Sequence, residues 1–261
     1  MTHQIRLFLT AVQFFTRIPV PAWVGHSAQQ LDQSARYFAL VGMGVGASAG
    51  ITLWLSAMVL PFSLAVTLSM LVSILITGAF HEDGLSDYVD GMGGGYTREK
   101  ILAIMKDSRV GAYGVIAIVL ALLIKFEAIL ALMGAFSSLI VAVTLIAAHA
   151  ISRLMAVSIM LTQQYVRDDD SARAKPVAQG MNSISFVIAA VTGAVATGLL
   201  WMAGVGVVSL VSAVACALLL RLYMGRQMNK KLGGYTGDCL GAVQQVTEIG
   251  FYLGMAASVG I

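Results

Sequence analysis

The stretch YGVIAIVLALLIKFEAILALMGAFSSLIVAVTLIAAHAISRLMAVSIM, residues 113–160, decides the fold, because Lys125, Glu127 and Arg153 are its only charged side chains. A helix that crosses a bilayer needs about 20 apolar residues, so this stretch is long enough for two. The whole chain of 261 residues has the same character: 58% are hydrophobic and 11% are charged, with a mean hydropathy of +0.85. Soluble domains carry about 25% charged residues. The composition excludes a disordered chain, a coiled coil and a small secreted scaffold, and it predicts an all-α, polytopic bundle of membrane helices.

Similar apolar stretches occur along most of the chain. We expect six to seven transmembrane helices within a single membrane-embedded domain, residues 1–261. Lys125 and Glu127 interrupt the third stretch, where they mark either an anchor at the outer leaflet or an earlier turn. Gln244, Gln245 and Glu248 place three polar side chains in the last stretch. The expected spans are residues 37–60, 62–80, 113–133, 136–160, 184–202, 205–222 and 240–261.

The first 24 residues have the pattern of a helix that lies in the membrane interface. Apolar side chains form one face of this helix, and such a segment lies along a membrane rather than across it. Pro19 ends it, and Ser27 with Gln30 resembles a capping box that starts the next helix. A direct contact of Arg17 with a substrate is the alternative to a plain amphipathic anchor. The opposite, polar stripe consists of Arg6, Thr10, Gln13 and Arg17.

The topology follows from the connections between the spans. Residues 81–111, 162–182 and 221–238 carry most of the Lys and Arg side chains, and they alternate along the chain with short, uncharged connections. The positive-inside rule places these three segments in the cytoplasm. They converge on one face of the bundle, which is where we expect an active site.

The densest group of charges is the sequence HEDGLSDYVDG at residues 81–91. If the preceding helix continues through it, Asp83, Asp87 and Asp90 fall at positions i, i+4 and i+7 on one side. Carboxylates packed together repel one another, and a divalent cation relieves that repulsion. Oxygen ligands favour magnesium, manganese or calcium over zinc, and magnesium also takes phosphate oxygens. Because ionised groups are costly near hydrocarbon, we interpret Glu82, Asp83, Asp87 and Asp90 as metal ligands rather than as a solvated acidic loop.

Cations follow these acids directly. Residues 92–95, MGGG, form a flexible connection whose backbone amides can approach a phosphate. A carboxylate-bound metal beside Arg and Lys is a usual arrangement for stabilising a transferring phosphoryl group. The alternative is that the cations only contact the anionic inner leaflet and set the topology. We favour substrate contact for residues 106–109, because the glycines at positions 111 and 114 let the backbone come close. The candidate side chains are Arg98, Lys106, Asp107 and Arg109.

Four further residues are candidates for substrate binding. Arg153 lies about two turns inside its expected span, so it should face a polar cavity unless it snorkels to the interface. His81 contacts the metal or the substrate, or simply ends a helix. Asp238 is either a helix N-cap or a fifth carboxylate of the site. Lys175 lies in a charged loop, of which residues 175–180 would fold over a substrate.

Three strings resemble one known family: FLTAVQFFTRIPVP at 8–21, TGAFHEDGLSDYVDGMGGGYTREKILAIMKDSRVGAYG at 77–114 and GGYTGDCLGA at 233–242. The chain is similar to the adenosylcobinamide-GDP ribazoletransferases, the bacterial cobalamin (cobalamin-5'-phosphate) synthases, over nearly its whole length. This resemblance implies a multi-pass, magnesium-dependent phosphotransferase of the bacterial inner membrane whose site faces the cytoplasm. Such an enzyme joins adenosylcobinamide-GDP to alpha-ribazole or its 5'-phosphate. It releases GMP together with adenosylcobalamin or its 5'-phosphate.

The resemblance also implies roles for the candidate residues. One or two Mg²⁺ ions bind the four acids, and Asp90 or Asp83 accepts the proton of a ribose hydroxyl. The expected partners are the two substrates, the lipid bilayer and other late enzymes of the cobalamin pathway, but no nucleic acid. The expected catalytic residues are Asp83, Asp87, Asp90, Lys106 and Arg109, and the expected substrate-binding residues are His81, Arg17, Arg98, Asp107, Arg153, Lys175 and Asp238.

Two other functions are alternatives. Asp87-Tyr-Val-Asp90-Gly matches the D-x-x-D-G opening of the CDP-alcohol phosphotransferases, which are lipid enzymes, but residues 92–95 replace the expected Ala-Arg and no two further aspartates follow at that family's interval. An ion-coupled transporter is the second alternative, because His149, Arg153 and Glu248 lie within expected spans. Carriers place such groups near the midplane of the membrane, whereas most acids here lie in one cytoplasmic segment. This location favours an enzyme.

Overall fold

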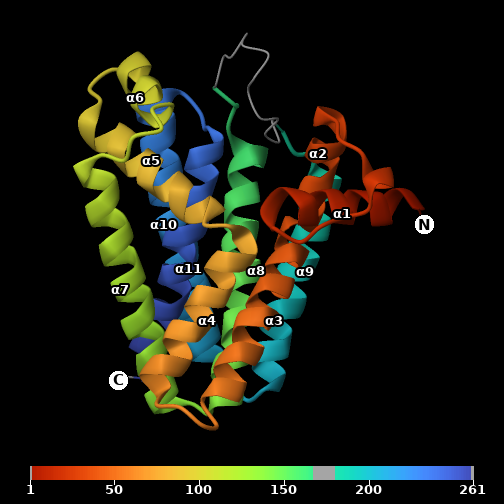
Figure 1. Ribbon diagram of the computed structural model, residues 1–261, viewed down its shortest axis with the longest axis vertical. Coiled ribbons are helices and arrows are strands. Elements are labelled where there is room, and N and C mark those ends of the chain that lie inside the picture. Colours follow the sequence, from red (N-terminus) through yellow and green to blue (C-terminus); the bar gives the residue numbers. More distant parts are fainter. Residues whose placement is uncertain (1, 167–179, 260–261) are drawn as a thin grey trace.

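The computed structural model describes residues 2–166 and 180–259, and the named elements within these ranges are all helices. Figure 1 shows long helices side by side in an upright bundle, with α1, α5 and α6 towards one end. The predicted all-α fold is confirmed. The α-helices are α1 (Thr2–Phe15), α2 (Ala28–Ser34), α3 (Phe38–Ser56), α4 (Phe62–Thr77), α5 (Phe80–Gly94), α6 (Arg98–Met105), α7 (Ala112–Ala135), α8 (Ser138–Thr162), α9 (Ser183–Met202), α10 (Val207–Leu232) and α11 (Gly237–Val259), and two short 3-10 turns cover Ala22–Val24 and Ala35–Tyr37.

Five helical units of the described chain are long and apolar enough to cross a membrane: Ala28–Ser56, which ends in α3, and the helices α7, α8, α9 and α10. The pair α4 and α5 makes a sixth unit if it is counted as one bent span. The lower value of the predicted six to seven spans therefore agrees with the structure. The helix α11 is not among these units, although it packs along α10, α5 and α8 inside the bundle. Its polar side chains Gln244, Gln245 and Glu248 lower its hydropathy, and all three are buried in the protein interior.

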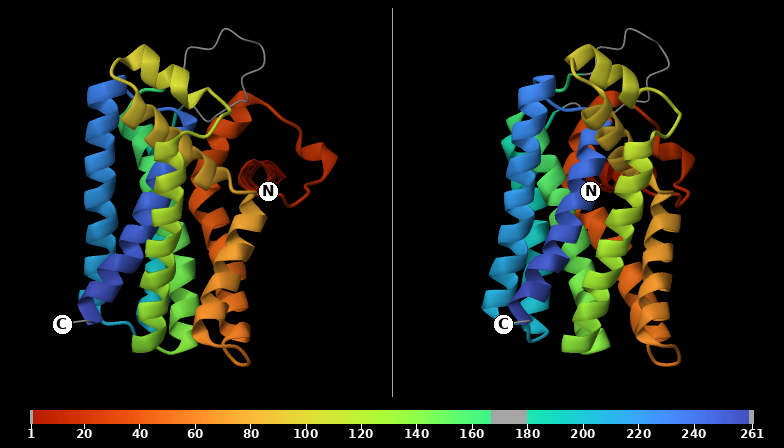
Figure 2. Two further views of the ribbon diagram at one scale, coloured as in Figure 1. Left: turned by 60° about the vertical axis from the view of Figure 1, so that its left-hand side comes forward. Right: turned by 90° about the vertical axis from the view of Figure 1, so that its left-hand side faces the viewer.

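The helix α1 lies across the bundle rather than along it, which agrees with the interfacial helix predicted for the N-terminus (Figures 1 and 2). Its apolar face is buried through Leu7, Ala11 and Phe15. The predicted cap of the next helix is also present, because the backbone N–H of Gln30 donates to Ser27 Oγ at 3.2 Å. The side chains of α1 therefore reach the bundle from one side, at the level where α4 ends.

The acidic helix α5 is not a continuation of α4. The two helices meet at an angle of 87°, and both residues of the connection take left-handed backbone angles, with φ of +65° at Gly78 and +58° at Ala79. A left-handed conformation costs a residue with a Cβ about 1–2 kcal/mol, so Ala79 is strained. Arg17 fits against this corner, where its backbone N–H donates to the carbonyl of Ile76 at 2.7 Å. The preceding helix therefore does not continue through residues 81–91, which was the condition on which the alignment of the acids was predicted, but the acids still lie at helical spacing within α5.

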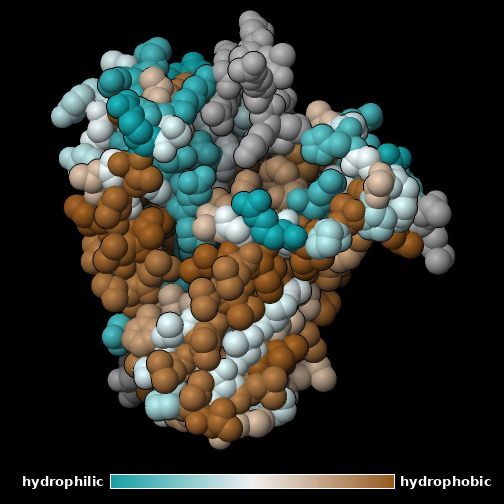
Figure 3. Space-filling model, viewed as in Figure 1, coloured by the Kyte–Doolittle hydropathy of each residue, from teal (hydrophilic) through white to brown (hydrophobic). Residues whose placement is uncertain are grey.

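The described parts of the three ion-rich segments meet at one end of the bundle, as the sequence predicts, and the segments 81–111 and 221–238 contain more helix than expected. The segment 221–238 is mostly the last turns of α10, and only residues 233–236 connect α10 to α11. Lys231 Nζ donates to the carbonyl of Met92 at the end of α5 (3.0 Å), and the backbone N–H of Tyr235 donates to the carbonyl of Gln164 (2.9 Å). Figure 3 shows the resulting hydrophilic end above a hydrophobic belt.

Close packing of α3 against α8 fixes the depth of the polar side chains on α8. Gly42, Gly46 and Gly50 form a stripe along α3, and a Cβ on any of them would lie within 3 Å of a carbonyl oxygen of α8. Small residues at this spacing let two membrane helices approach closely. The carbonyl opposite Gly42 belongs to His149, which places His149 and the following turn of α8 firmly in the bundle interior.

Candidate active site

The interior of the bundle contains a cluster of charged side chains about halfway along α7, α8 and α11. Lys125 Nζ lies 2.5 Å from Glu248 Oε1, and these side chains are almost fully buried. His149 Nδ1 lies 3.3 Å from Glu248 Oε2 and 3.2 Å from the guanidinium nitrogen Nη1 of Arg153. Tyr252 donates its hydroxyl to Glu248 at 3.2 Å. The sequence suggested that Lys125 marks either an anchor at the outer leaflet or an earlier turn. The structure shows instead that Lys125 forms an ion pair with a carboxylate on another helix.

A line of amides connects this cluster to the acidic helix. Gln244 Nε2 donates to Glu248 at 2.5 Å, Gln245 Nε2 donates to Gln244 Oε1 at 3.0 Å, and Gln245 Nε2 also donates to Glu82 Oε1 at 3.0 Å. The other oxygen of Glu82 is buried and has no hydrogen-bond partner among the described residues. Glu82 therefore points from α5 into the bundle, towards α11.

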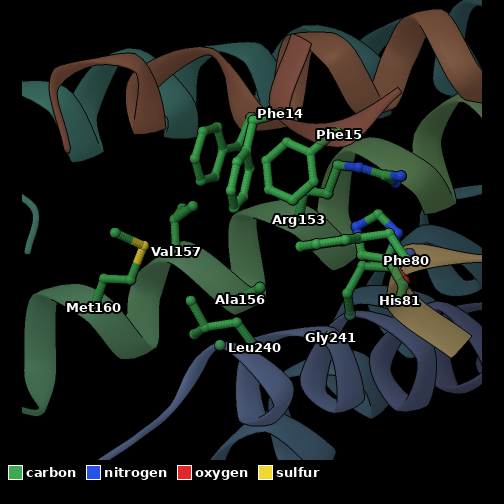
Figure 4. Close-up of a pocket in the computed structure, with 13 residues that line it drawn as sticks. Phe14, Phe15, Phe80, His81, Arg153, Ala156, Val157, Met160, Leu240 and Gly241 are labelled. Atoms are coloured by element: carbon green, nitrogen blue, oxygen red, sulfur yellow. The ribbon is translucent and has the colours of Figure 1, made fainter. Parts of the chain in front are cut away.

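An aromatic cavity lies between α1, α5, α8 and α11, and it encloses about 450 Å³ with its open mouth included. Figure 4 shows the Arg153 guanidinium and the His81 ring at the same end of this cavity, with Phe14 and Phe15 forming one wall. The His81 ring stacks on Phe15, with centroids 5.3 Å apart and planes 11° apart. Arg153 is 2% exposed, so it is buried in the bundle and does not snorkel, but the cavity that it lines is aromatic rather than the predicted polar one.

A second cavity, mostly polar in its lining side chains, adjoins the first. It encloses about 1250 Å³ with its mouth, and Asp83, Arg17 and His26 contribute charged or polar side chains to it. Phe14 and Phe80 line both cavities, so the two cavities are neighbours. Of the predicted site residues, the structure thus brings His81 and Arg153 to one cavity, and Arg17 and Asp83 to its neighbour.

Asp90 makes a structural contact that the sequence did not predict. It is 7% exposed, and its two oxygens accept the backbone N–H groups of Gly111 (2.7 Å) and Gly114 (2.8 Å) at the start of α7. A Cβ on either glycine would collide with this carboxylate. These glycines therefore make room for Asp90 rather than for a substrate, and Asp90 caps α7 because a carboxylate satisfies the free N–H groups of a helix start.

The four predicted metal ligands do not form one group. Glu82 turns towards α11 and Asp90 towards α7, whereas Asp83 and Asp87 remain one turn apart on α5. Throughout residues 2–166 and 180–259, no three side chains of His, Cys, Asp or Glu are placed to hold a metal ion together. Ligation by Asp83 and Asp87 stays a prediction.

The cations that follow the acids lie at the same hydrophilic end. Arg98, Lys106 and Arg109 are exposed, and Arg109 Nη2 lies 2.6 Å from Asp107 Oδ2. Hydrogen bonds from the Arg109 side chain and backbone lower the pKa of Asp107 to about 2. Asp107 therefore stays ionised and orients Arg109, which is a different task from direct substrate binding.

Two predicted site residues remain. Asp238 lies in the first turn of α11, but the cap is Thr236, whose Oγ1 accepts the backbone N–H of Cys239 at 3.4 Å. The backbone carbonyl of Asp238 packs against Gly84 of the acidic helix. Lys175 lies outside the described residues, as does the greater part of the segment 175–180 that was expected to cover a substrate.

The chain matches the family model for cobalamin-5-phosphate synthase over residues 7–256. It belongs to that family. Curated relatives are named adenosylcobinamide-GDP ribazoletransferase: that of Shewanella frigidimarina is 43% identical over 96% of this chain and 94% of its own length, and that of Leptothrix cholodnii is 43% identical over 99% and 98%. The relative from Shewanella oneidensis is 42% identical over 99% and 96%. No solved structure matches the chain.

Membership of the cobalamin-5-phosphate synthase family agrees with the resemblance seen in the sequence, and it makes the chain a ribazoletransferase rather than a lipid-headgroup enzyme or a transporter. The interior charges that suggested a transporter are paired with one another. Sequence reasoning missed the roles of Lys125, Gln244 and Gln245. The available signal was that polar side chains within membrane spans need buried partners. Lys125 is such a side chain in one expected span, and Glu248 with the two glutamines is such a group in another.

Proposed function

We propose that this chain joins adenosylcobinamide-GDP to alpha-ribazole or its 5'-phosphate in cobalamin biosynthesis. The observation that carries the proposal is the match to ribazoletransferases over 96% of the chain or more. In this reaction a ribose hydroxyl oxygen attacks the phosphorus next to the cobinamide, and the bond from that phosphorus to GMP breaks. GMP leaves with the electron pair, the hydroxyl proton passes to a carboxylate of the protein, and adenosylcobalamin or its 5'-phosphate remains.

Magnesium fits part of the predicted ligand set. Proteins commonly hold Mg²⁺ through one or two carboxylates, while water and substrate phosphates complete its coordination. Asp83 and Asp87 meet this need, because they lie one turn apart on α5 and Asp83 lines the polar cavity. Asp90 is less available, because each of its oxygens already accepts a backbone amide at the start of α7. When bound, the metal would neutralise negative charge on the pyrophosphate.

The side chains of the chain supply the remaining functions. Asp83 is the proposed acceptor of the hydroxyl proton, through a carboxylate oxygen that the metal would leave free, since both oxygens of Asp90 accept backbone amides of α7. Arg17 lies across the polar cavity from α5 and would bind phosphate oxygens there. Lys106 and Arg109 would contact the outer part of the nucleotide, with Arg109 held in place by Asp107.

The proposed location is the bacterial inner membrane, with α5 and α6 in the cytoplasm. The cations Arg98, Lys106, Arg109 and Lys231 support this orientation, because positively charged ends of membrane helices stay on the cytoplasmic side. Activated nucleotides are made in the cytoplasm, so the same orientation brings the site to its substrates. Other late enzymes of the cobalamin pathway are the proposed protein partners at this surface.

A direct assay tests the proposal. The full chain, purified in detergent, is mixed with adenosylcobinamide-GDP, alpha-ribazole and Mg²⁺, and GMP release is measured. We expect GMP and the cobalamin product in equal amounts, and no GMP when alpha-ribazole or Mg²⁺ is left out. Movement of substrate across vesicles with no chemistry would overturn the proposal in favour of transport.

A further inference from the structure

The aromatic cavity holds two polar atoms that no described side chain or backbone group satisfies. Arg153 Nε and His81 Nε2 are buried and lack hydrogen-bond partners among residues 2–166 and 180–259. Their side chains are 2% and 3% exposed, and both line the cavity. Buried polar groups in folded proteins almost always have partners, so the unpaired pair points to a ligand that supplies them.

The remaining walls of the cavity favour a flat, aromatic ligand. Phe14, Phe15, Phe38 and Phe80 surround it together with aliphatic side chains from α8 and α11. Aromatic rings pack well face to face when offset, or edge to face. Ligand sites of proteins are usually apolar clefts with a few fixed polar groups, and this cavity has that character, with Arg153 and His81 as its polar groups.

We infer that this cavity binds the benzimidazole base of alpha-ribazole; the inference rests on the proposed function. The base is a bicyclic aromatic ring with one nitrogen that carries no substituent and accepts a hydrogen bond. The Nε–H of Arg153 would donate to this nitrogen, and a bond from a charged donor is stronger than a neutral one. His81 Nε2 would then pair with a ribose hydroxyl, which either donates or accepts.

The position of the neighbouring cavity supports this assignment. Phe14 and Phe80 line both cavities, so the two cavities are neighbours. Asp83 lines the polar cavity. A base in the aromatic cavity would therefore leave its ribose close to a carboxylate and to the space proposed for the activated pyrophosphate.

A lipid acyl chain is the competing occupant, because the cavity opens near the interfacial helix α1. An acyl chain has no acceptor, so it would leave Arg153 Nε and His81 Nε2 unpaired. The unpaired atoms thus favour the heteroaromatic base.

The test compares Michaelis constants for the two substrates. Ala156 lines the cavity on α8, so Ala156→Leu fills it without touching the ionic cluster. Ala131→Leu on the exposed face of α7 is the matched control. We expect Ala156→Leu to raise the KM for alpha-ribazole at least tenfold, while the KM for adenosylcobinamide-GDP changes less than twofold and the control changes neither. Arg153→Lys keeps the charge but loses the Nε–H, and it should raise the same KM.

The outcomes separate this inference from the proposed function. Equal changes in both KM values, or no change in either, would overturn the assignment of the cavity. A lipid that co-purifies with the wild-type chain and is lost from Ala156→Leu would also overturn it, if the KM for alpha-ribazole is unchanged.

If the wild-type chain released no GMP, the proposed function would fail. Equilibrium dialysis with alpha-ribazole alone would still decide the inference. Binding to the wild type but not to Ala156→Leu would support it, and equal or absent binding would overturn it. Ala156→Val replaces Ala156→Leu if the larger side chain prevents folding.

Discussion

The buried pair of Lys125 and Glu248 gives a prediction whose size follows from the structure. Lys125→Met removes the charge but keeps a long side chain in the same space, so the carboxylate of Glu248 stays 0% exposed without its closest partner. Removal of one partner of a buried ion pair costs about 3–5 kcal/mol. His149, Gln244 and Tyr252 still contact Glu248, so we expect the lower value, about 3 kcal/mol. At about 2–4 °C per kcal/mol for chains of similar length, Tm should fall by about 6–12 °C.

The cysteines of the chain provide the assay. Cys239 is fully buried and Cys216 is partly exposed, and the sequence contains no other cysteine. In a Cys216→Ser background, a dye that fluoresces on reaction with thiols therefore reports exposure of Cys239 as the chain unfolds in detergent. Glu127→Gln, an exposed carboxylate on the same helix, is the control and should change the stability by less than about 0.5 kcal/mol.

The double variant isolates the interaction between the two charges. Lys125→Met combined with Glu248→Gln leaves neither charge in the interior. The loss in the free energy of unfolding should therefore be smaller than the sum of the two single losses, by about 2 kcal/mol, which is within the range for residues in contact. Two results would refute the reasoning that the attraction between these charges offsets the cost of burying them. One is a Tm for Lys125→Met within 2 °C of the wild type, and the other is a double variant whose loss of stability equals the sum of the two single losses.

Three further predictions concern the acidic helix and its connections. Asp90→Ala leaves the N–H groups of Gly111 and Gly114 buried without an acceptor, so the same dye assay should show a loss of about 2–4 kcal/mol; an unchanged Tm would contradict the capping role. Ala79→Gly relieves the left-handed strain and should raise the stability by about 1 kcal/mol, whereas a lower Tm would show that the strain is absent. Asp87→Asn should slow GMP release at least 100-fold at saturating Mg²⁺, and a near-normal rate would remove this side chain from the proposed metal site.

Local signals in the sequence were enough for much of the fold. The apolar stretches predict the long helices, and the Ser27–Gln30 pattern predicts the cap that the structure contains, because both depend on residues close together in the chain. The corner at Gly78 and Ala79 was not predictable in this way. Arg17, which follows α1 and lies about 60 residues earlier in the chain, packs against this corner, and its backbone N–H donates to the carbonyl of Ile76.

The site was predictable only in part, for a related reason. The spacing of Asp83, Asp87 and Asp90 correctly predicts that they share a helix, but spacing says nothing of what each side chain meets. Asp90 meets the start of α7, and Glu82 meets an amide on α11. The burial of Arg153 was predicted correctly, because an arginine within a membrane helix needs polar partners wherever they come from, and His149 supplies one.

The corner after α4 also changes how the protein sits in its bilayer. At 1.5 Å per residue, the 16 residues of α4 reach only about 24 Å, whereas the hydrocarbon core is about 30 Å thick. Beside α4 the bilayer must therefore thin, because hydrophobic mismatch is relieved at small cost by local deformation. Short-chain lipids should accommodate this side of the bundle better than long-chain lipids, so acyl-chain length becomes an adjustable variable when the enzyme is reconstituted.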